Sequence, residues 1–247
     1  MIPKIIHFCW LSNDPFPTNI QKCIDSWSKY MPDYQIIHWN FNRFPKGKSI
    51  WVDQAYECKK YAFAADYIRL YALYNYGGFY LDTDVEVINS FDDFLALNTM
   101  ICNQNSMPGM EVAAFGVEKG SQWIKYCLDS YVGRNFIEDG LFNMKPLPLV
   151  IDELLDKGNF QKKLVNTIQE AACVKDNVIP VLPCEFFSPK SYYTGIITIT
   201  KNTRCIHHFA GSWQHKSKLR RWVEGNISTR LLSKLRLIKF RICNLIK

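Results

Sequence analysis

Residues 64–85, with the sequence AADYIRLYALYNYGGFYLDTDV, hold the pattern that decides the fold. The first half predicts a helix, because Ala, Leu and Arg favour helices and the apolar side chains recur at helical spacing. The Gly77-Gly78 pair supplies the left-handed residue that ends such a helix. Phe79-Tyr80-Leu81 then predicts a short buried strand that ends at Asp82 and Asp84. In a strand, this i,i+2 spacing would place both carboxylates on one face.

Two neighbouring carboxylates repel each other, and a divalent cation removes that repulsion. Mg²⁺ and Mn²⁺ prefer carboxylate oxygens and share their remaining positions with substrate phosphates. Asp-x-Asp alone is more typical of a solvated acidic turn than of a metal site. Here, however, Asp66 and Arg69 precede it at i,i+3 on one helix face, where the alternative is a surface ion pair of little energy. The combination favours a metal–diphosphate site.

This constellation resembles the sugar-transferase DXD proteins of glycosyltransferase family 32, the related retaining transferases of family 8 and the large glucosylating bacterial toxins. Their shared pattern is Ser/Ala-Asp-x-x-Arg, then Gly-Gly, then Tyr-x-Asp-x-Asp, and residues 65–69 and 77–84 follow it with Ala65 in place of the usual Ser. The resemblance implies an α/β fold of the GT-A type, with a mostly parallel central sheet flanked by helices. It also implies metal-dependent hexosyl transfer with retained anomeric configuration.

Two more segments resemble these transferases. Residues 2–7, IPKIIH, with a Trp shortly after, match their opening, and residues 205–213, CIHHFAGSW, match their His-aromatic-x-Gly segment. The resemblance implies Asp82, Asp84 and Arg69 as catalytic residues, and Asp82, Asp84 and His208 as metal ligands, with His207 as the alternative. The residues that it implies for the nucleotide-sugar are Trp10 against uracil, Asp66, Arg69, Tyr80, Asp82, and Ser212 and Trp213 on the diphosphate.

Strands at residues 2–10 and 34–39, with an amphipathic helix at 18–30 between them, predict a βαβ unit and hence a parallel sheet. In such a sheet ligands bind beyond the carboxyl ends of the strands, where Trp10 and the two aspartates would both lie. His7, within the first strand, is expected to be a buried histidine with its hydrogen bonds satisfied. Further predicted elements are a helix in two pieces at 49–76, helices at 121–131 and 149–156, and strands at 99–103, 111–117, 178–183, 196–200 and from 205.

The middle third of the chain is expected to form the acceptor side of the site. Its polar candidates are Asn103, Gln104, Asn105, Glu111 and Asp152, and for each of them taken alone a solvated surface position is the favoured alternative.

The net charge of +7 is unevenly distributed along the 247 residues. Residues 216–247 hold ten Lys or Arg and one acidic residue, whereas residues 1–215 hold 20 basic and 22 acidic side chains. The basic segment also carries an apolar helical stripe from Leu231 to Leu245. We therefore expect a catalytic domain at 1–215 and a basic amphipathic tail at 216–247. An ordinary packed helix is the alternative to a helix that binds an anionic membrane. No nucleic-acid motif accompanies the basic residues.

The nine cysteines are odd in number and contain no Cys-x-x-Cys, which indicates reduced, mostly buried thiols rather than disulfides or a zinc site. The sequence shows no signal-peptide pattern and no apolar run long enough for a membrane span. We expect a cytoplasmic protein, peripheral on the inner face of the plasma membrane.

The resemblance to these families implies a transferase that uses Mn²⁺ or Mg²⁺ and a UDP-hexose, with galactose as the expected sugar and a lipid-linked saccharide of a bacterial capsule or surface polysaccharide as acceptor. A degenerate, non-catalytic nucleotide-sugar binding module is the alternative, and it would have lost a metal ligand. A hydrolase that uses two carboxylates is disfavoured, because aspartates at i,i+2 on one strand cannot flank a glycosidic bond.

Overall fold

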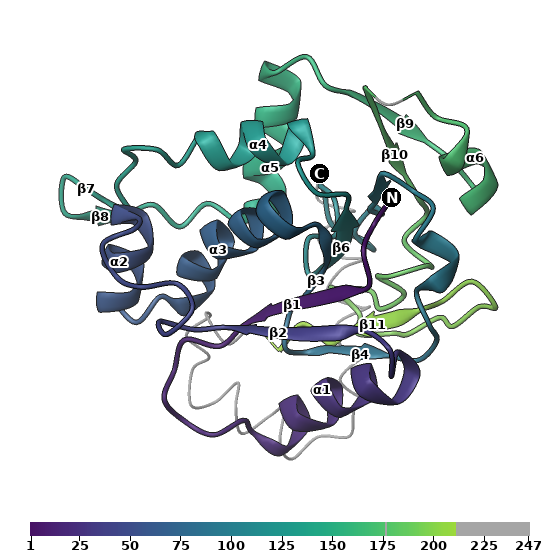
Figure 1. Cartoon of the computed structure of the whole chain (residues 1–247), viewed down its shortest axis with the longest axis horizontal. Helices are drawn as coiled ribbons and strands as arrows, with labels where there is room; N and C mark the ends of the chain where they lie inside the picture. The colour runs from purple at the N-terminus through teal and green to yellow at the C-terminus, as the bar shows by residue number, and fades with distance from the viewer. Residues whose placement is uncertain (176, 211–247) are drawn as a thin grey trace, which may run out of the picture.

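The computed structural model describes residues 1–175 and 177–210 (Figure 1). In chain order the elements are β1 (Ile5–Cys9), α1 (Thr18–Tyr30), β2 (Gln35–Trp39), α2 (Ile50–Glu57), α3 (Tyr61–Tyr76), β3 (Gly78–Leu81), β4 (Val85–Val87), the 3₁₀ turn η1 (Asp92–Phe94), β5 (Thr99–Met100), β6 (Ala114–Val117), α4 (Gln122–Asp129), β7 (Ile137–Glu138), β8 (Leu141–Phe142), α5 (Leu147–Lys157), β9 (Gln161–Leu164), α6 (Ile168–Ala172), β10 (Val178–Val181) and β11 (Cys205–His207).

A five-stranded sheet with the order β2-β1-β3-β6-β5 forms the centre of the α/β fold. β1 pairs parallel with β2 and β3, so the βαβ unit expected from the sequence is confirmed. β6 runs antiparallel to both β3 and β5, and the sheet is therefore mixed rather than mostly parallel. The physical reason is the connection: residues 101–113 join β5 to β6 without a helix, whereas the crossover between parallel strands usually contains one.

The transition from α3 to β3 depends on two glycines. Gly77 and Gly78 have φ angles of +66° and +102°, a region that side chains with a Cβ rarely adopt. A Cβ on Gly78 would also lie 2.6 Å from the carbonyl oxygen of Ile5. The predicted glycine end of the helix is thus confirmed in its positive φ, and Gly78 lets β3 pair closely with β1.

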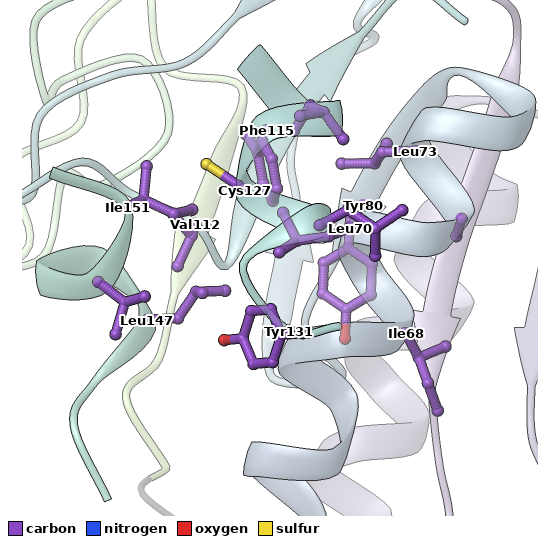
Figure 2. Close-up of a cluster of buried hydrophobic side chains, with 14 of the residues drawn as sticks. Ile68, Leu70, Leu73, Tyr80, Val112, Phe115, Cys127, Tyr131, Leu147 and Ile151 are labelled. Carbon is purple, nitrogen blue, oxygen red and sulfur yellow. The ribbon is translucent and has the colours of Figure 1, made fainter. Parts of the chain in front are cut away.

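Two hydrophobic cores lie on opposite faces of the sheet. Along β3, Tyr80 belongs to the core beneath α3, whereas Phe79 and Leu81 belong to the core that includes Trp27 of α1. Figure 2 shows the first core, where Leu70 and Leu73 of α3 lie with Tyr80 and Phe115. In Figure 1, α1 correspondingly lies across β1 and β2 from α3.

Two local predictions were wrong. Residues 196–200 form no strand, and Ile197 makes only an isolated bridge with Lys190. The strand was predicted from the β-branched residues of this segment. Ile196 and Ile199 are exposed, however, and a strand needs burial and a pairing partner to be stable. Asp82 and Asp84 lie in a turn between β3 and β4 rather than on a strand, because Val85 N donates to Asp82 O at 2.9 Å.

The eight cysteines in the described part of the chain are free thiols, four of them buried. No helix among the described residues is long and apolar enough to cross a membrane. The predicted tail at 216–247 lies outside the described residues.

Candidate metal and donor site

The turn that carries Asp82 and Asp84 is anchored by main-chain hydrogen bonds. Asp82 N donates to Ala113 O at 2.7 Å, beside β6, and His208 N donates to Asp84 O at 3.1 Å. Ala210 N donates to the side-chain Oδ2 of Asp84 at 2.7 Å. Two distant segments, at residue 113 and at residues 208–210, therefore fix the turn that holds the two aspartates at the carboxyl end of β3.

The histidine beside these carboxylates is His207. One ligand atom each from Asp82, Asp84 and His207 lie within 4.8 Å of one another, and His207 Nε2 is 3.7 Å from Asp84 Oδ1. His208, the ligand expected first, instead places its Nε2 2.9 Å from Glu86 Oε2. His207 is the last residue of β11 and His208 follows it; because successive side chains of an extended chain point to opposite sides, the fallback His207 is the one at the site.

Glu111 holds the other nitrogen of His207. Its Oε2 lies 3.2 Å from His207 Nδ1 and accepts a hydrogen bond from Ser188 Oγ at 2.7 Å, while its Oε1 accepts from Ala113 N at 3.0 Å. The Glu111 side chain is fully buried. Glu111 therefore contacts His207 from the interior of the protein. The sequence analysis had instead placed it among the candidates on the acceptor side of the site.

Arg69 joins two carboxylates. Its Nη2 lies 3.2 Å from both Asp66 Oδ1 and Asp82 Oδ1, and its Nη1 donates to Val112 O at 2.7 Å. The guanidinium also stacks 4.5 Å from the centroid of the Tyr80 ring. Arg69, Asp66 and Tyr80 are all buried, so the contacts described here position Asp82. The expected contacts of Asp66, Arg69 and Tyr80 with the donor stay predictions.

The electrostatics of the site follow from burial and from its carboxylates. Burial would lower the pKa of His207, but Glu111 and Asp84 outweigh it and raise the pKa to about 9. Burial raises the pKa of Asp66 to about 7 and also raises the pKa of Asp82, in both cases against the opposing charge of Arg69. The pKa of Glu111 is lowered, because His207 and hydrogen bonds outweigh its burial. An ionised Glu111 can only accept a hydrogen bond, so Nδ1 of His207 donates to it.

Trp10 follows β1, and because β1 and β3 are parallel it lies at the same edge of the sheet as the aspartates. It is partly exposed, its Nε1 donates to Asp14 O at 2.9 Å, and it packs edge-on against Phe16. The expected stacking on a uracil stays a prediction.

His7 is buried as expected, with Nε2 2.8 Å from Gly77 O and Nδ1 accepting from Trp39.

The remaining candidates are dispersed. Asp152 pairs with Lys162 at 3.1 Å, and Asn105 donates to Pro189 O at 3.2 Å. Asn103 is exposed and Gln104 is partly exposed. None of these contacts tests a role in acceptor binding. Ser212 and Trp213 lie outside the described residues.

Residues 17–106 match the family model described as "Glycosyltransferase sugar-binding region containing DXD motif". Residues 17–106 are therefore similar to sugar-binding regions of the DXD type, and the resemblance drawn from the sequence is confirmed. Residues 82–84 of this match supply both aspartates of the site.

Known proteins with similar sequences include two fungal enzymes. Inositol phosphoceramide mannosyltransferase 3 of Schizosaccharomyces pombe is 32% identical over 131 residues, which cover 50% of this chain and 35% of that protein. A mannosyl phosphorylinositol ceramide synthase of Saccharomyces cerevisiae is 35% identical over 103 residues, covering 39% of this chain and 26% of that protein. The chain thus spans about a third or less of these relatives. Among solved structures, the PaToxG glycosyltransferase is 21% identical with a TM-score of 0.49, covering 64% of this chain and 69% of that one.

Proposed function

We propose that this chain, which carries a DXD-type glycosyltransferase region, is a metal-dependent enzyme that moves a hexosyl group from a nucleotide-sugar to an acceptor hydroxyl. The observation that carries the proposal is the convergence of Asp82, Asp84 and His207 within 4.8 Å of one another at the carboxyl end of β3. We also propose that the α/β fold of this chain is of the GT-A type.

The residues fit a divalent cation. Two carboxylates and an imidazole suit Mn²⁺, which accepts both oxygen and nitrogen ligands, and Mg²⁺ would bind through the carboxylates. Ligands on opposite sides of such an ion lie about 4 Å apart. The three ligand atoms are therefore close enough for one ion after small side-chain shifts. A bound ion would supply positive charge to the diphosphate as it leaves the sugar.

The protein's own residues would orient this site rather than exchange protons. Arg69 holds Asp82, the amide of Ala210 holds Asp84, and Glu111 holds His207. Held in this way, the ligands need little reorganisation when charge develops on the leaving group, which is the basis of electrostatic catalysis. In this proposal Asp66 and Arg69 also contact the donor sugar and ribose, and Ser212 and Trp213 contact its phosphates.

The hexose is open to direct test. The resemblance to bacterial transferases suggests UDP-galactose, whereas both fungal relatives are named for mannosyl transfer. We place mannose first for that reason and galactose second. Retention of anomeric configuration is part of the proposal, and the anomer of the first-formed product tests it.

The acceptor proposed here is a saccharide or polyol on a lipid anchor. The names of the fungal relatives, which specify inositol phosphoceramide, support a lipid-borne acceptor for this chain. Synthesis of a surface polysaccharide on the inner face of the plasma membrane, with residues 216–247 on anionic lipid, is the biological setting that we propose. A non-catalytic binding module is disfavoured, because Asp82, Asp84 and a histidine are all present at the site.

A donor screen tests the proposed function. Purified protein with Mn²⁺ is given GDP-mannose, UDP-galactose, UDP-glucose and UDP-N-acetylglucosamine, and nucleotide release is measured. We expect release from one donor, absent with a chelator and reduced about 10²–10³-fold or more in Asp84→Asn, as for the loss of one electrostatic contact in a transition state. Asp93→Asn, which removes an exposed carboxylate paired with Arg204, is the matched control and should be active. Undiminished release in the chelator would refute the metal mechanism.

A further inference from the structure

Adjacent histidines at the end of β11 each face a glutamate. Glu86 Oε2 lies 2.9 Å from His208 Nε2, and Glu111 Oε2 lies 3.2 Å from His207 Nδ1. The two pairs differ in burial, because the side chain of Glu86 is 44% exposed and that of Glu111 is 0% exposed. A buried carboxylate is costly unless its hydrogen bonds are satisfied, so Glu111 needs a structural or functional reason.

The hydrogen bonds of Glu111 keep its carboxylate in one orientation. Ala113 N, from the same loop, occupies Oε1, and Ser188 Oγ shares Oε2 with His207, so two distant segments converge on this one side chain. Rotation of the carboxylate would break the contacts with Ala113, just before β6, and with Ser188 together. Glu111 is therefore a fixed acceptor, against which the His207 ring is held by the bond from Nδ1.

The hydrogen bond from Nδ1 of His207 determines which nitrogen of the ring is left to bind a metal. With Nδ1–H donated to Glu111, the opposite ring nitrogen is the one that faces Asp84, at 3.7 Å from Oδ1. Carboxylates that accept from the far nitrogen of a metal-binding histidine set its tautomer and raise its basicity. Phe209, whose ring centroid lies 4.0 Å from that of His207, packs against the ring as well.

We propose that Glu111 is the positioning residue of the metal site: it orients His207 so that Nε2, rather than Nδ1, completes the ligand set of Asp82 and Asp84. This inference rests on the proposed function and adds to it a residue that does not touch the metal or the donor. It also explains why a carboxylate lies buried against His207 at the end of β11.

The test compares Glu111→Gln with Glu86→Gln, the same change in the carboxylate that faces the neighbouring histidine. Mn²⁺ affinity is measured by calorimetry without nucleotide and with UDP or GDP, so the readout does not depend on turnover. Glu111→Gln should raise the dissociation constant about 10–100-fold, as outer-shell changes at metal sites do. Glu86→Gln should leave it unchanged. Equal affinities of the wild type and Glu111→Gln would overturn the positioning role while leaving the proposed function intact. A wild type that binds no Mn²⁺ under any of these conditions would overturn both.

A measurement on the wild type covers the case in which Glu111→Gln does not fold. In protein labelled with ¹⁵N at histidine, Zn²⁺ serves as a diamagnetic probe of the site. We expect the Nε2 resonance of His207 to shift on Zn²⁺ addition while Nδ1 stays protonated. Coordination through Nδ1, or a shift of His208 in place of His207, would overturn the proposal.

Discussion

Replacing Arg69 by Met should destabilise the protein far more than an ordinary ion-pair loss. Arg69 is 5% exposed and lies 3.2 Å from a carboxylate oxygen of both Asp66 and Asp82. Met fills a similar volume but leaves these carboxylates without their cation. Removal of one partner from a buried ion pair costs about 3–5 kcal/mol. The Val112 carbonyl, which accepts from Arg69 at 2.7 Å, also loses its donor.

The matched control is Lys125→Met. Lys125 Nζ lies 2.6 Å from Asp129 Oδ2, closer than Arg69 lies to its carboxylates, yet the two side chains are 40% and 50% exposed. Loss of a solvent-exposed pair costs roughly 0–1 kcal/mol. If burial rather than distance decides the magnitude, Arg69→Met must lose several times more unfolding free energy than Lys125→Met.

Urea unfolding followed by circular dichroism measures both variants, and a third variant locates the cause. Asp66→Asn in the Arg69→Met background removes one uncompensated carboxylate. It should recover about 1–3 kcal/mol, within the coupling range of residues in contact. A loss below about 1 kcal/mol in Arg69→Met, which is the exposed-pair range, would refute the interpretation of Arg69 as the buried cation that neutralises Asp66 and Asp82.

Three further predictions concern other parts of the chain. Burial lowers the pKa of His7 to about 4, so the unfolded state binds its proton more readily; the wild type should therefore lose about 2 kcal/mol of stability relative to His7→Gln between pH 7 and pH 5, since the other titrating groups, including Asp66 with its opposite effect, are common to both, and an equal pH dependence of the two proteins would contradict this. Trp10→Ala should weaken UDP binding, measured by calorimetry, by about 1–3 kcal/mol, because one base–aromatic stack contributes about that much. Unchanged UDP affinity would mean that Trp10 only packs against its neighbours and does not contact the base. Truncation after Lys216 should leave donor hydrolysis intact but abolish co-sedimentation with anionic vesicles, which in the full chain should weaken as salt rises; equal binding of the full chain to neutral vesicles would refute an electrostatic tail.

The sequence allowed the long, strongly patterned elements to be predicted well. The 18–30 helix and the helix that ends at Gly77 before β3 show apolar residues at helical spacing and end at turn residues. This pattern is compatible with few structures other than a helix. The antiparallel course of β6 was not predictable in the same way. Residues 114–117 are buried in the sheet, and a short apolar run has the same composition in a parallel or an antiparallel strand.

The site was predicted in composition but not in geometry. The convergence of Asp82 and Asp84 was expected from strand alternation, whereas a turn produces it. The choice between His207 and His208 depends on the register of β11, where a shift of one residue exchanges the two faces. Glu111 lies 96 residues from His207 in sequence, so spacing gave no signal that the two side chains meet.

The central claim is that Asp82, Asp84 and His207 together hold a divalent cation. Its most direct test is Mn²⁺ titration calorimetry of the wild type, His207→Ala and His208→Ala, each without nucleotide and with UDP or GDP. We expect one Mn²⁺ per chain in the wild type, the same affinity in His208→Ala, and a loss in His207→Ala at least as large as the roughly 10–100-fold of an outer-shell change. Full affinity in His207→Ala with loss in His208→Ala would contradict the site described here.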